Sequence, residues 1–255
     1  MSAWGSMKNF RLVMLDYAKH QLDKPIAQKT LSDMITTKQK NYERTDPNYV
    51  VVDKHDMIGT HALIYETTNL FEPRLISAIR LTYECRARLH KLKIPSHDLI
   101  PHFNSNCKNA FQKFEKQNPN YADCNSWFID PEFSHKNSNL QLADISFTMI
   151  FLQLSRMGLK NFIGFTNERY KGHRRLEKII SFEKGNEFTH PVVPDQHMLI
   201  LMENFNLAHL KFVYESNKYL FDNILEVSPK NEKYKSIAQT IQDELVDKWM
   251  GISAA

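Results

Sequence analysis

The sequence of 255 residues contains only three cysteines and seven glycines, and it has no long apolar run. Cys85, Cys107 and Cys124 are odd in number and form no Cys-x-x-Cys pair, which implies neither a disulfide framework nor a zinc knuckle. The longest apolar stretch, Phe147–Leu154, is interrupted by Thr and Gln and falls far short of the ~20 residues that cross a bilayer. We therefore expect a protein of the reducing cytoplasm with no integral membrane segment.

The composition is that of a globular protein. Hydrophobic residues make up 42% and charged residues 24%, which argues against wholesale disorder. The 33 basic and 29 acidic residues leave a net charge of +4, and this mild excess requires no nucleic-acid partner. Residues 1–6 lack the basic and apolar stretches of a signal peptide. We expect them to be a remnant of an expression vector in front of a native start at Met7.

The first half of the chain changes character three times. Apolar residues at helical spacing predict two helices over Lys8–Thr45, separated at Pro25. Alternating and β-branched runs then predict strands at Tyr49–Val52, Thr60–Glu66 and Arg74–Tyr83. The polar stretch over residues 86–121, with one predicted helix at Asn109–Gln117, has the character of a long insertion.

The second half alternates between strands and helices. Strands are predicted at Cys124–Ile129, Lys160–Thr166 and His197–Glu203, and helices at Leu142–Met157, His173–Phe182, Leu207–Leu225 and Tyr234–Trp249. A strand-helix-strand unit closes with its strands parallel. No linker rich in Pro or Ser divides the chain, so we expect a single α/β domain over residues 7–255. Its core is expected over about 49–205, with C-terminal helices over 206–250.

One motif follows the strand predicted at Cys124–Ile129. Asp130-Pro131-Glu132-Phe133 and the polar loop Ser134–Asn139 lead into the next helix. This order resembles the central motif of the GNAT acyltransferase superfamily, whose Gly-containing loop binds the pyrophosphate of coenzyme A. Small residues let backbone N–H groups and a helix N-terminus face that anion. Here Asn137 and Asn139 replace the glycines, and Phe182 stands where the superfamily often has the tyrosine that protonates the leaving thiolate.

With these departures, the sequence resembles one branch of the superfamily more closely than the others. In the acyl-homoserine-lactone synthases and long-chain N-acyl amino acid synthases this strand reads roughly Ala-Glu-Leu-Ser-Arg-x-x-Val-Asp-Pro, and here it begins at Ala122. Asp123 falls on the Glu, while Ser126 replaces the Arg. These families also carry acidic residues before the second strand and an Arg in the third, which are matched here by Asp53, Asp56 and Arg80. The resemblance covers about residues 53–203.

The resemblance implies a mixed, twisted sheet flanked by helices, with extra helices at both ends of the chain. It also implies an enzyme that moves an acyl group from a phosphopantetheine thioester, carried by an acyl carrier protein or coenzyme A, to the amine of a small molecule such as an amino acid. Two alternatives stay open. One is an acetyl-CoA-dependent N-acetyltransferase, and the other is a non-catalytic acyl- or nucleotide-sensing or interaction module on the same fold.

The resemblance also assigns candidate catalytic groups. Asp123 would accept a proton from the acceptor amine, directly or through a water, and the backbone N–H groups of Phe128 and Ile129 would bind the thioester oxyanion. Strand alternation predicts that Asp123, Asn125 and Trp127 share one face. The alternative for Asp123 is a solvated strand end, and for Trp127 it is a place in the core.

Candidate acceptor-binding residues are Arg80, Asp53, Asp56 and Trp127. A guanidinium suits bidentate binding of an acceptor carboxylate, and the alternative is that Arg80 only forms an ion pair with Glu66 or Asp56. Candidate acyl-donor residues are His135, Lys136, Asn137, Ser138 and Asn139 in the loop, followed by Arg174 and Arg175. The two arginines would attract an acidic carrier protein, unless they only form a solvated helix face.

The sequence contains eleven histidines, but none in a metal-binding pattern. His97, Asp98 and His102 match neither His-Glu-x-x-His nor a Cys/His site, so we expect no metal. No Gly-x-Ser-x-Gly segment occurs, which disfavours a covalent serine mechanism. The oligomeric state is not encoded in any feature of the sequence that we recognise.

Overall fold

The computed structural model describes residues 9–42, 53–133, 141–167, 172–191, 195–229 and 234–247, except for the side chains of residues 41–42 and 172–175. Within these ranges one mixed sheet has the strand order β6-β8-β5-β4-β3-β2-β1-β9, with β7 paired to β8. The strands are β1 (Phe10–Asp16), β2 (Thr60–Glu66), β3 (Arg74–Tyr83), β4 (Ala122–Ile129), β5 (Phe162–Asn167), β6 (Ile180–Phe182), β7 (Glu187–Thr189), β8 (Gln196–Phe205) and β9 (Leu225–Val227).

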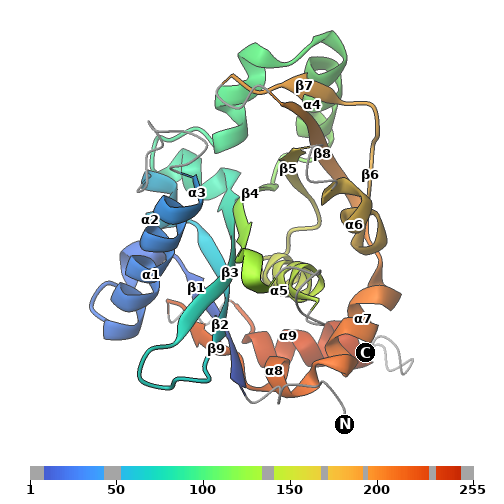
Figure 1. Ribbon diagram of the computed structural model, residues 1–255. Helices are drawn as coiled ribbons and strands as arrows, with labels where there is room; N and C mark the ends of the chain where they lie inside the picture. The colour runs from blue at the N-terminus through green and yellow to red at the C-terminus, as the bar shows by residue number, and fades with distance from the viewer. Residues whose placement is uncertain are drawn as a thin grey trace.

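Helices cover both faces of this sheet (Figure 1). They are α1 (Pro25–Tyr42), α2 (Lys54–Ile58), α3 (Glu84–Leu89), α4 (Ser105–Gln117), α5 (Leu142–Arg156), α6 (Gly172–Ile179), α7 (Leu207–Ser216), α8 (Lys218–Asp222) and α9 (Ile237–Ile241). Short 3-10 segments lie at η2 (Ala18–His20), η3 (Pro95–His102) and η4 (Pro131–Phe133), and a π-helical turn at Gln242–Val246 follows α9. No helix in the described ranges is both long and apolar enough to pass through a membrane.

Two strand pairs are parallel, β4 with β5 and β1 with β9, and the others are antiparallel. The β4-α5-β5 unit therefore has the parallel arrangement that the sequence predicted, and the expected mixed α/β fold is confirmed. Gly164 in β5 lies directly opposite Cys124 in β4. A Cβ atom at Gly164 would lie 2.8 Å from the carbonyl oxygen of Cys124, so this close approach requires glycine.

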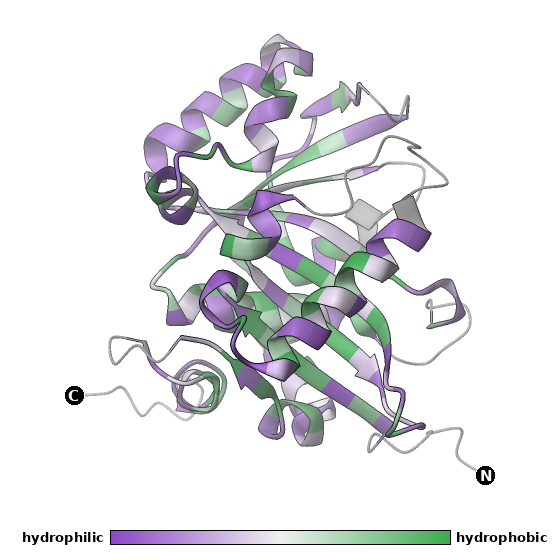
Figure 2. Ribbon diagram, turned by 90° about the vertical axis from the view of Figure 1, so that its left-hand side faces the viewer, coloured by the Kyte–Doolittle hydropathy of each residue, from purple (hydrophilic) through white to green (hydrophobic). Residues whose placement is uncertain are grey.

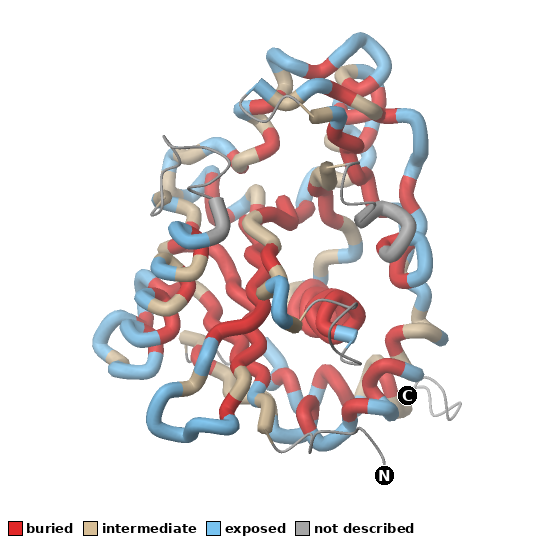
Figure 3. Tube along the Cα trace, viewed as in Figure 1, coloured by how far each residue is buried: buried red, intermediate tan, exposed pale blue. Residues whose placement is uncertain are grey.

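The largest core lies on the α5 face of the sheet. Fourteen of the 15 residues of α5 are buried, because α7 and α9 cover the side of the helix that the sheet leaves free. Figure 3 shows α5 as a red tube in the interior, whereas α1 has exposed residues along its outer side. Figure 2 shows hydrophilic residues gathered on the peripheral helices and hydrophobic residues concentrated in the interior strands.

The opposite face of the sheet carries α1, α2 and the segment predicted as an insertion. Helix α1 packs on β1 to β4 through residues such as Ala27 and Met34. Residues 86–121 form a separate core with β5, β7 and β8, centred on Phe103, Phe111 and Phe188. This segment is thus packed onto the sheet, and its helix α4 begins four residues earlier than predicted.

The predictions for both ends of the chain were wrong in part. Phe10–Asp16 is a strand rather than a helix, since its run of buried residues pairs with β2 on one side and β9 on the other. The sheet therefore extends beyond residues 49–205 at both ends. The helix predicted over Leu207–Leu225 is interrupted at Asn217 and ends before β9, and Ile180–Phe182 is a strand rather than the end of a helix. The strand predicted at Tyr49–Val52 lies outside the described residues.

Candidate active site

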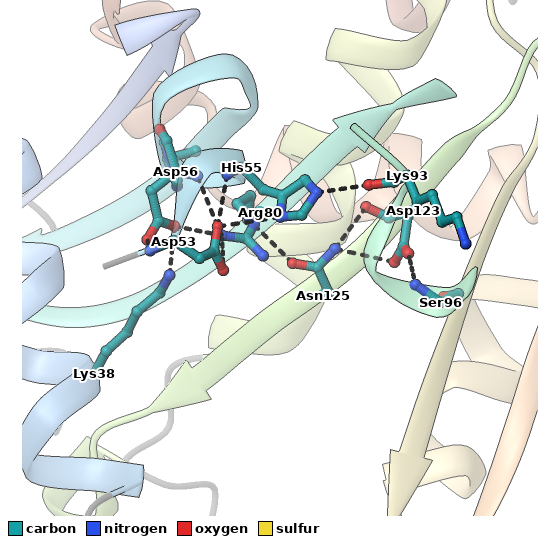
Figure 4. Close-up of polar contacts among 10 residues, drawn as sticks. Lys38, Asp53, His55, Asp56, Arg80, Lys93, Ser96, Asp123 and Asn125 are labelled. Atoms are coloured by element: carbon teal, nitrogen blue, oxygen red, sulfur yellow. Dashed lines mark hydrogen bonds and ion pairs between the residues drawn. The ribbon is translucent and has the colours of Figure 1, made fainter. Parts of the chain in front are cut away.

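A chain of polar side chains, most of them buried, crosses the face of the sheet opposite α5 (Figure 4). Asp53 directly precedes α2 and Asp56 lies in its first turn, whereas Arg80 comes from β3, and Asn125 and Asp123 come from β4. Asp53 is the N-cap of α2 and forms a capping box with Asp56, which fixes both carboxylates beside the strand. The structure thus brings together four of the predicted site residues, Asp53, Asp56, Arg80 and Asp123.

Arg80 is the centre of this network. Its Nη1 donates to Asp53 Oδ1 and Oδ2 at 2.8 and 2.9 Å and to Asp56 Oδ1 at 2.5 Å, and its Nε donates to Asn125 Oδ1 at 2.7 Å. The residue is only 2% exposed. Within the described residues its Nη2 forms no hydrogen bond, so two guanidinium N–H groups are left for a ligand. The ion pair with Asp56 that we considered from the sequence is present, and the pair with Glu66 is not.

Lys38 is a site residue that the sequence analysis missed. It projects from α1, is 1% exposed, and donates to Asp56 Oδ1 at 2.5 Å. Burial and the positive charge of Arg80 lower its pKa, although Asp56 acts in the opposite direction. The helical pattern of α1 could not reveal this role, because the lysine is identified only by its contact with a residue 18 positions away.

The acidic residues of α2 titrate below their usual range. Burial acts to raise the pKa of Asp56, but the positive charges of Arg80 and Lys38 outweigh it and lower that pKa. The pKa of Asp53 is lowered against burial by the hydrogen bond from the His55 side chain and by the charge of Arg80. Both groups are therefore carboxylates, and they hold Arg80 in place by charge-assisted hydrogen bonds.

Asp123 is completely buried, at 0% exposure. Its Oδ2 accepts from the backbone N–H of Ser96 in η3 at 2.6 Å, and its Oδ1 accepts from Asn125 Nδ2 at 3.0 Å. Burial raises its pKa, and the hydrogen bonds from Asn125 and Ser96 oppose that shift. The alternative of a solvated strand end is therefore wrong, and the packed insertion supplies one partner of this carboxylate.

The strands β4 and β5 separate next to this network. Their parallel pairing ends at Cys124 and Gly164, yet β4 continues to Ile129 beside β3 and β5 continues to Asn167 beside β8. A bulge in β4 lies at this point, where Ser126 has a φ of 52° and the register against β3 shifts by one residue. After the bulge, the backbone groups of β4 that face β5 no longer form hydrogen bonds with β5 as part of the sheet.

The strand register indicates which amides face that edge. Asp130 donates its N–H to Ile76 on β3, and hydrogen-bonded and non-hydrogen-bonded pairs alternate along an antiparallel ladder. The Ile129 N–H therefore faces β5, as the proposed oxyanion role requires. The Phe128 N–H faces β3 and is not available to a ligand at that edge, so of the two predicted amides only that of Ile129 stays a candidate.

The bulge also moves Trp127 away from the place predicted for it. Asp123 and Asn125 lie on the α1 and α2 face, but Trp127 packs edge-on against Phe147 of α5, with ring centroids 5.4 Å apart. The extra residue at Ser126 breaks the two-residue period on which the prediction depended. Trp127 thus packs against the core on the opposite face from Arg80. The prediction that it shares a face with Asp123 and Asn125 is wrong, and its contact with an acceptor stays a prediction.

The predicted acyl-donor residues cannot be placed in this way. His135, Lys136, Asn137, Ser138 and Asn139 lie outside the described residues. Arg174 and Arg175 lie in α6, but their side chains are likewise outside the description. Phe182 is 8% exposed and belongs to the core beside α5.

His97, one of the histidines of the insertion, forms hydrogen bonds with its neighbours. His97 contacts Glu115 at 2.8 Å and Tyr121 at 3.3 Å. Among the described residues, no three His, Cys, Asp or Glu side chains converge in a way that could hold a metal ion.

Comparison with solved structures places this architecture among known folds. The chain is similar to the CoA-dependent acyl-homoserine lactone synthase BjaI with SAM and isopentyl-CoA (TM-score 0.52, 10% identity, 91% of this chain and 98% of that chain). It is similar to the same enzyme with MTA (TM-score 0.51, 11% identity, 91% and 98%). A likeness to FeeM, an N-acyl amino acid synthase from uncultured soil microbes, has a TM-score of 0.48 (12% identity, 77% and 92%).

No family model matches the chain, and no curated protein matches it in sequence. At identities this low, structural similarity establishes the fold alone. The chain has the fold of the acyl-homoserine lactone synthases, and the resemblance drawn from Asp53, Arg80 and Asp123 is confirmed at that level.

Proposed function

We propose that the chain is an N-acyltransferase that moves an acyl group from a thioester to the amine of a small acceptor bearing a carboxylate. The observation that carries this proposal is the separation of β4 from β5 beyond Cys124 and Gly164, directly beside a buried arginine network. A strand edge whose N–H groups are not used in the sheet can bind a carbonyl oxygen as it becomes an oxyanion. Acyl transfer is also the chemistry named for the BjaI structures that share this fold.

The reaction forms one C–N bond and breaks one C–S bond. The neutral amine nitrogen attacks the thioester carbonyl carbon, and the Ile129 N–H stabilises the negative charge that develops on the carbonyl oxygen. The intermediate then expels the thiolate, which takes up a proton from solvent because Phe182 has no hydroxyl group to donate. The products are an N-acylated acceptor and a free thiol.

The acceptor carboxylate binds to Arg80. Its Nη2 is the one guanidinium nitrogen left free in the described residues, since Asp53, Asp56 and Asn125 occupy the others. The two N–H bonds of this nitrogen diverge, so one of them donates a charge-assisted hydrogen bond to a carboxylate oxygen. An α-amino acid has this group next to its amine, and so does S-adenosylmethionine, the SAM present in one BjaI structure.

Asp123 takes the proton that the acceptor amine loses. Its raised pKa brings its proton affinity nearer to neutral pH, which suits a general base. Because its carboxylate is covered by Ser96 and Asn125, the proton reaches it through a bridging water or after η3 moves. An aspartate is one methylene shorter than the glutamate of the resembling families, which also favours a water between base and amine.

The donor is an acyl-phosphopantetheine thioester on an acyl carrier protein or on coenzyme A. Its proposed contacts are the loop residues His135–Asn139 and the two arginines Arg174 and Arg175. The asparagines at 137 and 139 disfavour tight binding of the coenzyme A pyrophosphate, and the two arginines favour an acidic carrier protein.

The test supplies octanoyl-CoA, acetyl-CoA or octanoyl acyl carrier protein together with the twenty amino acids and S-adenosylmethionine. Mass spectrometry should detect an N-acylated acceptor and free thiol in equal amounts. Arg80→Met should raise the acceptor KM at least tenfold with little change in donor KM. Arg74→Met is the matched control, because Arg74 lies on the same strand but is exposed and pairs with Asp130 and Glu132.

The outcomes separate the alternatives. Transfer from acetyl-CoA alone would indicate an ordinary N-acetyltransferase. Absence of thiol release from every donor, with a bound thioester or nucleotide in the purified protein, would overturn the proposal in favour of a sensing module.

A further inference from the structure

A cavity lies on the α5 face, away from the Arg80 network. It has a volume of about 560 Å³ and is formed where the end of β1 meets α3, the last turn of α5, β9 and the segment before α9. The residues that matter for its chemistry are Asp16, Arg86, Arg156, Glu226, Lys235 and His20. None of them takes part in the proposed acyl transfer.

The floor of this cavity consists of two buried arginines fixed by two carboxylates. Arg86 binds Asp16 through both terminal nitrogens, at 2.6 and 3.1 Å. Arg156 pairs with Asp16 at 3.5 Å and hydrogen-bonds to Glu226. The Arg86 guanidinium also lies between the rings of Tyr17 and Tyr83, 4.5 and 4.6 Å from their centroids. The two charges of each sign cancel, so the floor is rigid and neutral.

The carboxylates of the floor have hydrogen-bond partners, but one donor of the floor has none. All four carboxylate oxygens accept hydrogen bonds, since Thr60 also donates to Asp16, and Ser228 and the Ile237 N–H donate to Glu226. By contrast, the Nε of Arg156 is buried and has no hydrogen-bond partner in the described part of the chain. The side chain of Arg156 is only 2% exposed. A buried donor without an acceptor is costly, and a ligand oxygen would satisfy it.

Two basic side chains line the mouth of the cavity, and one of them, Lys235, pairs with Asp243. The other is His20, and Lys19 stands next to it without an ion-pair partner among the described residues. The pKa of His90 nearby is lowered by desolvation and then by the positive charges of Lys19, His20 and Arg86. The mouth thus carries basic side chains, and the buried group of the floor that lacks a partner is a donor.

We propose that this cavity is a second binding site, which takes a small organic anion bearing carboxylate or phosphate oxygens. The anion enters past Lys235 and His20 and places an oxygen toward the unused donor of Arg156. A cavity of this volume is large enough for a metabolite-sized ligand. The proposal is independent of the acyl-transfer function, because no residue is shared between the two sites.

The experiment measures binding of citrate and, separately, of inorganic phosphate by isothermal titration calorimetry at low ionic strength, where charge effects are least screened. At least one anion should bind saturably with one site per chain. Lys235→Glu should weaken that binding about tenfold, since it replaces a positive charge at the mouth by a negative one. The ligand that binds identifies whether carboxylate or phosphate is preferred.

Lys218→Glu is the matched control. Lys218 and Lys235 are exposed to a similar degree, at 60% and 65%, and each pairs with one aspartate, but Lys218 does not line the cavity. Its replacement should change the affinity less than twofold. The proposal is overturned if neither anion binds saturably, or if both variants weaken binding equally and so reveal a general charge effect.

Discussion

Arg80 and Asp123 are joined through one amide, that of Asn125. The side chain of Asn125 accepts a hydrogen bond from Arg80 Nε at 2.7 Å and donates one to Asp123 Oδ1 at 3.0 Å. An amide can do this in only one orientation, so the proposed carboxylate-binding group and the proposed base are positioned by the same residue. Arg80 and Asn125 also face each other in the β3–β4 ladder, which fixes the distance between them.

Asp123→Asn should lower turnover by ~10²–10⁴, the usual effect of removing a positioned acid or base. The donor KM should change little, because Asp123 does not face the separated strand edges. In the parent protein, kcat/KM should decrease as the pH is lowered and Asp123 becomes protonated. This decrease should begin above the usual aspartate pKa, since burial raises the pKa of Asp123. Steady-state kinetics from pH 4 to 9 should show that the variant lacks this decrease of kcat/KM at low pH. Full turnover of Asp123→Asn would place the base elsewhere.

The same substitution should change how stability depends on pH. The pKa of Asp123 is raised in the folded state, so between the usual and the raised pKa the folded protein holds more protons than the unfolded chain. The free energy of unfolding therefore decreases as the pH rises through that window. Asp123→Asn removes this decrease, and its stability relative to the parent should be higher at pH 8 than at pH 4. Urea denaturation at both pH values measures it, and an unchanged difference contradicts it.

The strand-helix-strand centre of the fold could be predicted because its signals are local. Asp130-Pro131 ends a buried strand, Leu142–Arg156 has helical length, and Gly158 follows with a φ of 68°, so β4, α5 and β5 were each recognised. Phe10–Asp16 was not recognised, because apolar residues at positions 10, 13 and 14 fit a helix as well as a buried strand. Only its pairing with β2 and β9 decides between them.

The residues of the candidate site were likewise predicted only where a local pattern identifies them. Asp53, Arg80 and Asp123 were found through their positions in a resembling motif, and Asp123 and Asn125 share a face by simple alternation. Trp127 was misplaced because nothing in the sequence marks Ser126 as the site of a bulge. Lys38 was missed, since tertiary pairing with Asp56 rather than any local pattern gives it a role.

Lys38→Met should reduce the free energy of unfolding at pH 7 by about 1–3 kcal/mol, because the buried carboxylate of Asp56 loses one of its two cationic partners. The folded-state pKa of Asp56 is lowered, so this stabilisation is present above the usual aspartate pKa and is lost as the pH falls below it. The difference from the parent should thus shrink near pH 3. Lys29→Met on the same helix, where Lys29 forms an exposed pair with Asp33, should cost less than ~1 kcal/mol. Equal losses in both variants would contradict a special role for Lys38.

Gly164→Ala should destabilise the protein by about 1–3 kcal/mol, because the new methyl group meets the Cys124 carbonyl oxygen at 2.8 Å and forces β4 and β5 apart. This pair is the last one before the strands separate, so donor binding should weaken as well. Gly158→Asn is the control, since that position is open and its φ of 68° suits asparagine. Thermal unfolding and a thioester titration measure both effects, and tight donor binding by Gly164→Ala would show that the strand separation does not form the donor site.

Ile129→Pro tests the backbone group that we propose for the oxyanion. Proline removes the N–H of Ile129, which faces away from β3, so the β3–β4 ladder keeps its hydrogen bonds and the fold should persist. Turnover should fall by ~10²–10³, the cost of one oxyanion-hole donor, with acceptor KM nearly unchanged. Phe128→Pro, one residue earlier, removes an N–H that faces β3 and should instead destabilise the protein by ~3 kcal/mol or more. Circular dichroism and acyl-transfer assays on both variants distinguish the two roles. If Ile129→Pro keeps its fold and its full turnover, the oxyanion is bound by another group.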